Sequence, residues 1–302
     1  MIRKLLLSIM FIPAIIIAQP ANSWIDYTQS YFKFPIINDG VYRISYQQLT
    51  NAGVNVTNID PRNIQIFAKG TEQAIYIEGE SDGTFDGNDF IEIYCEHNDG
   101  WYDHMLYSDS AHALNPYYSM FTDTAFYFLT WNNSTSNERM ISEVDLNFNA
   151  YTPSPYFWHE EKDIDTKLFH EGQTTSAGRA VPEYSEGEGW YELRVNSQGF
   201  KEKSLSTPYK KVGAPDGWIK TKIAGVGAYT HFVEIYYNDS VIYKDNFNNT
   251  STVTVEFPLK VDWVNDNSDF LYKSVSPEYN KWKDRFAVAY SHIRYGRQYN
   301  LG

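Results

Sequence analysis

Short runs in which apolar and polar residues alternate dominate the sequence, and turn-forming residues separate them. Alternation with a period of two indicates strands that bury one face. In the first half it predicts strands at residues 31–37, 41–46, 64–68, 74–78, 90–95 and 125–131. We interpret Asn38-Asp39-Gly40 and Lys69-Gly70-Thr71 as the turns of two hairpins, because glycine supplies the positive φ that tight turns need.

The second half continues this pattern without interleaved helices. Strands are predicted at residues 190–195, 218–226, 232–237, 241–246, 252–257, 270–275 and 285–295. Asn238-Asp239-Ser240 is expected to close a hairpin between two of them. Strands that follow one another through turns are typical of antiparallel sandwiches. We therefore expect an all-β protein with two β-rich domains, the second a jelly-roll-like antiparallel sandwich with one short helix.

Two segments are helix candidates. Ser45 and Gly53 have the residue types that begin and end a helix, so a short helix is predicted between them. Residues 158–170, with the sequence WHEEKDIDTKLFH, are the main helix candidate of the second half. The proline- and asparagine-containing segment 147–155 suits a linker. The expected domains are therefore residues 24–150 and 151–302.

The first 23 residues are typical of a secretory signal peptide. Arg3 and Lys4 precede an apolar run of about 13 residues, and small residues such as Ala18 and Ala21 offer cleavage points. A run of that length is too short to cross a bilayer as a helix. We therefore expect an exported protein of the periplasm, outer membrane or cell surface.

Composition limits the classes of partner that the chain can bind and the disulfides that it can form. The formal net charge is −13 over 302 residues, and such a field repels nucleic acid and anionic lipid. Cys95 is the only cysteine, so no internal disulfide can form and packing must hold the fold together. Aromatic residues make up 17% of the chain, which suits half-buried strand surfaces.

Three aspartates lie in the turn-rich segment between Gly79 and Tyr94, and they are candidate calcium ligands: Asp82, Asp86 and Asp89. Calcium prefers several converging oxygen atoms. The spacing departs from an EF-hand, because Thr84 holds the third position of the loop. The alternative is a solvated turn whose carboxylates accept hydrogen bonds from nearby backbone amides.

A long polar and aromatic segment, residues 96–124, separates two predicted strands. Its candidate binding residues are Trp101, Tyr102, Tyr107, Tyr117 and Tyr118. Exposed, they would form a platform for sugar or peptide; buried, they would plug the end of a sandwich. The segment also holds a histidine and aspartate cluster with no standard zinc spacing: His97, His104, His112, Asp99, Asp103 and Asp109. A mobile surface loop is the simpler interpretation of that cluster.

Cys95 and His97 share one face of a predicted strand, so thiol and imidazole could approach each other. A cysteine nucleophile also needs a group that orients its base, and Glu96 points to the opposite face. We therefore favour a strand thiol that packs as a small hydrophobic group. Four tryptophans are expected in the core or at its edges: Trp190, Trp218, Trp263 and Trp282.

Several motifs taken in order resemble a known family. They are the run Asp39-Gly40-Val41-Tyr42-Arg43-Ile44, the run from Asp60 to Gly70 (DPRNIQIFAKG), the acidic segment that follows, and Tyr295-Gly296-Arg297-Gln298-Tyr299. This order resembles the region that precedes catalysis in gingipain-like cysteine peptidases of Bacteroidetes, especially the PorU-type sortases of type IX secretion.

The resemblance implies a non-catalytic scaffold or docking region whose peptidase domain lies outside this chain. The full-length parent would be a cysteine endopeptidase with a histidine–cysteine dyad, and no residue here matches that dyad. The implied partners are the downstream peptidase domain, exported protein substrates and outer-membrane secretion components, with no nucleic acid. The alternative is a free-standing secreted carbohydrate-binding or adhesion module. An enzyme that uses Cys95 is a third possibility.

Overall fold

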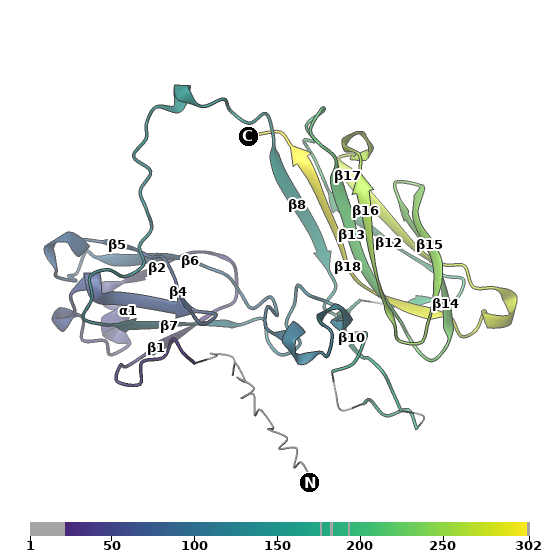
Figure 1. Ribbon diagram of the computed structural model, residues 1–302, viewed down its shortest axis with the longest axis horizontal. Coiled ribbons are helices and arrows are strands. Elements are labelled where there is room, and N and C mark those ends of the chain that lie inside the picture. Colours follow the sequence, from purple (N-terminus) through teal and green to yellow (C-terminus); the bar gives the residue numbers. More distant parts are fainter. Residues whose placement is uncertain (1–21, 176, 182–183, 193, 301–302) are drawn as a thin grey trace, which may run out of the picture. The chain divides into compact units, whose positions relative to one another are not determined.

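The computed structural model describes residues 22–175, 177–181, 184–192 and 194–300 (Figure 1). The expected signal peptide, residues 1–23, lies outside these ranges except for its last two residues. Strands make up nearly all the regular structure, so the all-β prediction is confirmed. Among the described residues, no helix has the length and hydrophobicity required to cross a membrane.

The chain forms two compact units, and each contains two segments of the sequence. The first unit comprises the described residues of Met1–Cys95 together with Phe126–Ser142. The second comprises Glu96–Ala125 and the described residues of Glu143–Gly302. The segment 96–124, which we call the excursion, therefore packs with the later part of the chain rather than with the strands that flank it.

The first unit contains two small sheets. One has the strand order β1 (Phe32–Ile36), β7 (Ala125–Trp131), β3 (Ile64–Ala68) and β4 (Thr71–Glu72). The other has the order β2 (Gly40–Ser45), β6 (Phe90–Cys95) and β5 (Tyr76–Glu78). The buried side chains come from both sheets and include Ile36, Ile66, Ile91, Ile93 and Leu129.

Both hairpins predicted for this unit are wrong. β1 and β2 belong to different sheets, and so do β3 and β5. The turn at Lys69 and Gly70 instead closes a hairpin with the two-residue strand β4. Alternation specifies which face of a strand is buried, but it does not specify which neighbour the strand pairs with.

The short helix of the first unit lies where the sequence predicts it. Helix α1 (Tyr46–Asn51) begins after Ser45, whose hydroxyl accepts the Gln48 backbone amide while the Gln48 side chain accepts the Ser45 amide. This capping box satisfies two otherwise unpaired donors. Gly53 follows the helix with a φ of +84°, a conformation that glycine adopts without strain.

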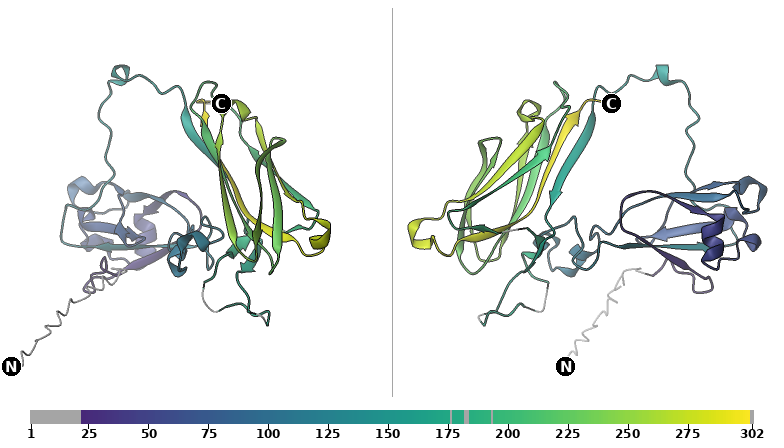
Figure 2. Two further views of the ribbon diagram at one scale, coloured as in Figure 1. Left: turned by 45° about the vertical axis from the view of Figure 1, so that its right-hand side comes forward. Right: turned by 180° about the vertical axis from the view of Figure 1, so that it is seen from behind.

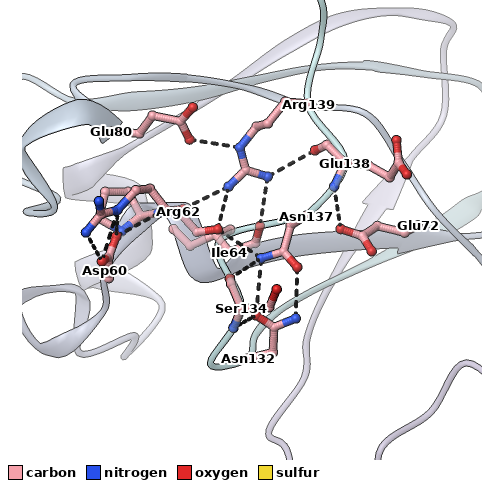
Figure 3. Close-up of polar contacts among 11 residues, drawn as sticks. Asp60, Arg62, Ile64, Glu72, Glu80, Asn132, Ser134, Asn137, Glu138 and Arg139 are labelled. Carbon is pink, nitrogen blue, oxygen red and sulfur yellow. Dashed lines mark hydrogen bonds and ion pairs between the residues drawn. The ribbon is translucent and has the colours of Figure 1, made fainter.

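One arginine anchors the segment that follows β7 to the rest of the first unit. Figure 3 shows the guanidinium of Arg139 between the Glu80 carboxylate and the backbone around β3. Its Nε lies 2.8 Å from Glu80 Oε2, and its two terminal nitrogens donate to four carbonyl oxygens, those of Pro61, Arg62, Ile64 and Glu138. Its side chain is only 20% exposed. Arg139 therefore joins three segments that are distant in sequence.

The second unit is an antiparallel sandwich (Figure 2). Its five-stranded sheet contains β8 (Phe157–Ile164), β11 (Val195–Asn196), β13 (Gly217–Gly225), β16 (Thr252–Leu259) and β18 (Arg285–Arg297). Its four-stranded sheet contains β12 (Phe200–Ser206), β14 (Thr230–Tyr237), β15 (Ser240–Asn248) and β17 (Asn267–Ser274). A two-stranded ribbon consists of β9 (Leu168–Glu171) and β10 (Glu188–Tyr191). One apolar core between the two main sheets holds Ile219, Ile223, Val233, Phe270 and Ile293.

Asn238 and Asp239 close the predicted hairpin between β14 and β15. Both residues have positive φ, 43° and 65°, which matches the two-residue turn that antiparallel strands favour. Short 3-10 turns complete the regular structure at Val56–Asn58, Pro61–Asn63, Glu80–Asp82, Asp103–Leu106, Ser110–His112, Phe148–Ala150, Val261–Trp263 and Glu278–Asn280.

The helix predicted at residues 158–170 is wrong. This segment is strand β8, followed by β9, and β8 pairs with the second half of β18. Along β8 the side chains of Trp158, Glu160 and Lys162 lie on one face of the sheet, as alternation with a period of two requires. The many charged residues resemble a helix surface, but here they belong to a strand with a solvent-facing side.

Candidate ligand-binding face

The five aromatic residues predicted to bind a ligand occupy different environments. Trp101 and Tyr102 are each 41% exposed and contact each other edge to face, with ring centroids 5.1 Å apart. Tyr107 is buried, and its hydroxyl donates to the Glu188 carbonyl oxygen at 2.9 Å. Burial raises the pKa of the Tyr107 hydroxyl. Tyr107 therefore belongs to the framework of the second unit, whereas Trp101 and Tyr102 are accessible.

The other two predicted residues, Tyr117 and Tyr118, attach the excursion to the sandwich. Tyr118 contacts Trp190 edge to face at 6.0 Å. Tyr117 lies over β18, with its ring centroid 4.9 Å from that of Tyr290. Further along, the ammonium group of Lys222 on β13 donates to two carbonyl oxygens of the excursion. The excursion is thus packed against the sandwich.

The acidic turn of the first unit uses its carboxylates to hold the backbone. Asp82 accepts the Thr84 amide at 2.8 Å, and Asp86 accepts the Asn88 amide at 3.1 Å. Asp89 is buried and accepts the Asp86 amide at 2.8 Å. No group of three or more histidine, cysteine, aspartate or glutamate side chains in the described parts of the chain is placed to hold a metal ion.

The other candidate chemistry also has structural explanations. Cys95 is completely buried, and this burial raises the pKa of its thiol to about 12. A thiol with that pKa is protonated at neutral pH and is not a nucleophile. In the excursion, Asp103 accepts hydrogen bonds from the Ser119 hydroxyl and the Met120 amide. Asp109 accepts the Ala111 amide at 2.9 Å.

A set of charged and aromatic side chains lies on the side of the five-stranded sheet that faces away from its core. We call this set the outer face: Trp158, Glu160, Lys162, Trp218, Lys220, His292, Arg294 and, from the excursion, Tyr117. Register places Arg294 between Glu160 and Trp218, and His292 between Lys162 and Lys220. The two residues of β18, Arg294 and His292, therefore lie at the centre. Five residues of the adjacent strands surround them: Trp158, Glu160, Lys162, Trp218 and Lys220.

His292 is the buried centre of the outer face. It is 3% exposed, and burial is the chief reason that its pKa falls to about 4, so the ring is neutral at pH 7. Its Nε2 lies 3.0 Å from Glu160 Oε2, and a carboxylate can only accept, so Nε2 carries the proton. Nδ1 is then the acceptor for the Tyr117 hydroxyl at 2.9 Å. The hydrogen bonds therefore run in one direction: Tyr117 donates to His292, and His292 donates to Glu160.

Cations cover the aromatic rings around this centre. The Arg294 guanidinium lies 4.6 Å from the centroid of the Trp158 ring, and Lys220 Nζ lies 5.3 Å from that of Trp218. Lys162 Nζ lies 4.8 Å from the Tyr117 ring centroid. Such cation–π contacts are strongest where water is partly excluded. Each ring therefore has a charged neighbour on one side instead of an open stacking surface.

The outer face is accessible to solvent at its margin and at the central Arg294. Trp158 is 37% exposed, and the Lys162 and Arg294 side chains are 37% and 35% exposed. Arg294 Nε is buried and has no hydrogen-bond partner among the described residues, since Glu160 Oε1 is 3.9 Å away. Tryptophan, tyrosine and arginine are the residues enriched at protein interfaces. The arrangement suits recognition of a macromolecular surface by a rigid, partly desolvated patch.

Sequence reasoning missed most of this face. Trp158, Glu160 and Lys162 fall in the segment predicted as a helix, and Trp218 was expected in the core or at its edges. Residues 158–163 are polar on both faces of β8 apart from Trp158, so the sequence carries no alternation of apolar and polar residues that could have identified this strand. Only Tyr117 belongs both to the predicted binding residues and to the outer face.

A separate cluster of buried charges lies at the edge of the sandwich. Lys203 on β12 forms ion pairs with the buried Asp165 and, at 3.2 Å, with Asp163. Burial raises the pKa of Asp165 to about 7 despite the nearby ammonium group of Lys203. Glu192 shares a hydrogen bond with Asp165, and that bond together with two lysines lowers the Glu192 pKa. The cluster joins β12 to the end of β8 and the residue that follows it, and its central pair, Lys203 and Asp165, is nearly closed to solvent.

Comparison with known proteins gives structural likenesses only. No sequence profile of a known protein family matches the chain, and no curated protein is detectably similar to it in sequence. The crystal structure of dimeric latent PorU from Porphyromonas gingivalis superimposes with a TM-score of 0.49 and 10% identity over 89% of this chain. This chain spans only 24% of the length of that structure.

Carbohydrate-binding modules superimpose on less of the chain. A family 36 module in complex with calcium and xylotriose gives a TM-score of 0.25 at 10% identity, over 45% of this chain and 98% of the module. A family 35 module from Clostridium thermocellum gives 0.26 at 12% identity, over 44% of this chain and 96% of the module. Likenesses at this level do not decide between functions, which must be argued from the residues of this chain.

Proposed function

We propose that this chain is a non-catalytic docking region of an exported, gingipain-like cysteine peptidase of the PorU type. In this proposal the protein acts in type IX secretion, as a sortase of Bacteroidetes, in the periplasm, at the outer membrane or on the cell surface. The order of the motifs between Asp39 and Tyr299 supports the relation. The peptidase domain and its histidine–cysteine dyad belong to the parent protein.

The observation that carries the docking role is the outer face. Its rings have cations as neighbours, its central histidine is locked by two hydrogen bonds, and its margin is accessible. A surface whose side chains are already fixed loses little conformational entropy when a partner binds. We assign the following peptidase domain as its first partner. Exported protein substrates and outer-membrane secretion components are further candidates.

The test uses the mature chain and the peptidase domain encoded in the same gene, expressed as separate polypeptides. Isothermal titration should show binding that weakens about tenfold or more in Arg294→Glu, because the substitution reverses the charge of the face. Lys273→Glu is the matched control, since Lys273 is exposed on the other sheet. Trp158→Ala should also weaken binding, and Trp263→Ala, at a similarly exposed tryptophan, should not.

Two results would reject the docking proposal. One is a gene that encodes no cysteine-peptidase domain after codon 302. The other is binding between the two polypeptides that Arg294→Glu and Trp158→Ala leave unchanged.

A second candidate is a free-standing carbohydrate-binding or adhesion module, and the exposed pair Trp101 and Tyr102 favours it. It predicts glycan binding that is lost in Trp101→Ala. Tyr107→Ala is unsuitable for this test, because the buried Tyr107 would destabilise the unit when truncated.

A calcium ion at Asp82, Asp86 and Asp89 is a further proposal, and it requires these carboxylates to turn towards one another. Its test is the melting temperature with calcium and with a chelator. A rise with calcium that Asp86→Asn removes would support the site, and equal melting temperatures would exclude it.

A further inference from the structure

Trp282 was expected in the core or at its edges, but it is exposed at one end of the sandwich. It is 80% exposed, and Tyr279 in the same loop is 81% exposed. Large aromatic side chains with that exposure leave most of their apolar surface in water, which is unfavourable unless a ligand covers it. Trp282 therefore needs an explanation other than packing.

Trp282 forms one wall of a hollow of about 380 Å³. Lys281 Nζ lies 5.4 Å from the centroid of its ring, and the side chain is still 80% exposed, so the ammonium group covers only a small part of the indole. The other groups that line this hollow are polar: Asn196, Ser197, Gln198, Lys281 and Arg285. Ser197 Oγ is buried and has no hydrogen-bond partner among the described residues. A buried hydroxyl without a partner is costly unless a ligand or water satisfies it. The hollow thus combines an apolar wall with amide, hydroxyl and guanidinium groups that have capacity for hydrogen bonds.

Buried hydrogen bonds fix both sides of this hollow. On one side, the backbone amide of Gln198 donates to Ser274 Oγ at 3.2 Å, and the Ser274 hydroxyl donates to Asp284 Oδ2 at 2.7 Å. On the other side, Asp284 itself ends the loop that carries Trp282. It is fully buried and also accepts the Phe232 amide and contacts His231 Nδ1 at 3.1 Å. One hydrogen-bond chain therefore connects the two walls.

The loop between Pro277 and Asp284 has a second anchor. Asn280 is buried, and its side-chain amide donates to the Thr230 carbonyl oxygen at 2.6 Å. Its own carbonyl oxygen accepts the amides of Lys283 and Asp284. Trp282 is consequently displayed by a rigid loop, and a binding site with prearranged walls loses less entropy when it is filled.

We propose that the Trp282 hollow binds a pyranose sugar unit of a glycan. A pyranose ring has an apolar face of C–H groups, which would pack on the indole, and a rim of hydroxyl groups. Asn196 and Gln198 can both donate and accept hydrogen bonds with such hydroxyls, and Arg285 can donate several. Arg285 is exposed and lines the hollow, so its guanidinium is accessible for this role. The proposal is independent of the docking role of the outer face.

The test is a glycan array followed by titration calorimetry with the mature chain. The array should contain neutral hexasaccharides of glucose, xylose, mannose and galactose, and oligogalacturonate as the acidic representative. Trp282→Ala should weaken binding about tenfold or more, because truncating a central tryptophan removes most of the contact area. Asn196→Ala combined with Gln198→Ala should weaken it by a smaller factor, about threefold to tenfold.

A stability measurement and one control variant make the outcome specific. Trp282 is so exposed that its loss should leave the melting temperature unchanged, which separates binding from folding. Trp263→Ala is the matched control, because it removes another accessible tryptophan and should leave affinity unchanged. The proposal is overturned if no glycan of the array binds, or if binding survives Trp282→Ala. Loss in Trp101→Ala alone would assign the sugar to the other aromatic pair and would also overturn it.

Discussion

Replacement of Asp165 by asparagine should change how the stability of the second unit depends on pH. Asp165 is 3% exposed, and burial raises its pKa to about 7 in the folded protein. In an unfolded chain the pKa of an aspartate is about 3.9. The folded protein therefore holds this proton more tightly than the unfolded chain does. Protonation favours folding, and this contribution is lost as the pH rises through 7.

The size of the effect follows from the difference between the two pKa values. Each pKa unit corresponds to about 1.4 kcal/mol, and pH 5 lies about two units below the folded value. Wild-type protein should therefore gain about 3 kcal/mol of stability from Asp165 when the pH falls from 8 to 5. Asparagine cannot titrate, so Asp165→Asn lacks this gain. Relative to wild type, the variant should be more stable at pH 8 than at pH 5 by about the same amount.

Urea unfolding at pH 5, 6, 7 and 8 measures this difference in stability. Hydrogen exchange in peptides from β8 and β12 serves as the readout of unfolding. The half-exposed neighbour Asp163 provides the control, because Asp163→Asn removes a carboxylate from the same Lys203 ammonium without removing the buried proton. A stability difference between Asp165→Asn and wild type that stays constant from pH 5 to pH 8 would refute the reasoning.

Three further predictions concern the first unit. Arg139→Ala should destabilise it by about 2–4 kcal/mol, because four carbonyl oxygens and Glu80 lose their donor. Arg43→Ala, which removes an exposed ion pair, should cost under about 1 kcal/mol. Equal urea midpoints for the two variants would contradict this prediction. Gly79→Ala should lower the stability more than Gly53→Ala, although the two glycines have a similar φ. The new Cβ at position 79 would lie 2.0 Å from Asp89 Oδ1, whereas at position 53 it would meet no described atom within 4 Å. The melting temperatures of the two variants test this prediction. Cys95 should react with a thiol reagent at pH 8 only after denaturant is added, since burial raises its pKa to about 12, and rapid native labelling would disprove this.

The sequence was sufficient to predict the positions of most strands and the local caps, but β8, β9 and β12 were not predicted as strands. Ser45 and Gly53 bound the helix as expected, and Asn238 and Asp239 form the expected turn, because these signals act within a few residues. Pairing depends on distant partners, which is why β1 and β2 separate into different sheets. The same limit applies to β8, whose charged residues acquire a role only beside His292 and Arg294.

The candidate sites were less predictable because exposure is a tertiary property. Tyr107 and Trp101 both lie in the polar excursion, yet one is buried and the other is accessible. Trp282 was expected in the core or at its edges. Its exposure depends on Asp284 and Asn280, which direct the loop outwards through contacts with β14 and β17.

Strand β18 constrains the order in which the sandwich can assemble during synthesis. It lies inside the five-stranded sheet, with β13 on one side and β8 and β11 on the other. Tyr290 pairs with Ile164, so β8 leaves the ribosome more than a hundred residues before its partner exists. Until then β8 and β13 both present an open edge, and non-local pairing of this kind is slow. A chaperone that protects these edges in the nascent chain would therefore have its greatest effect before residue 297 is translated.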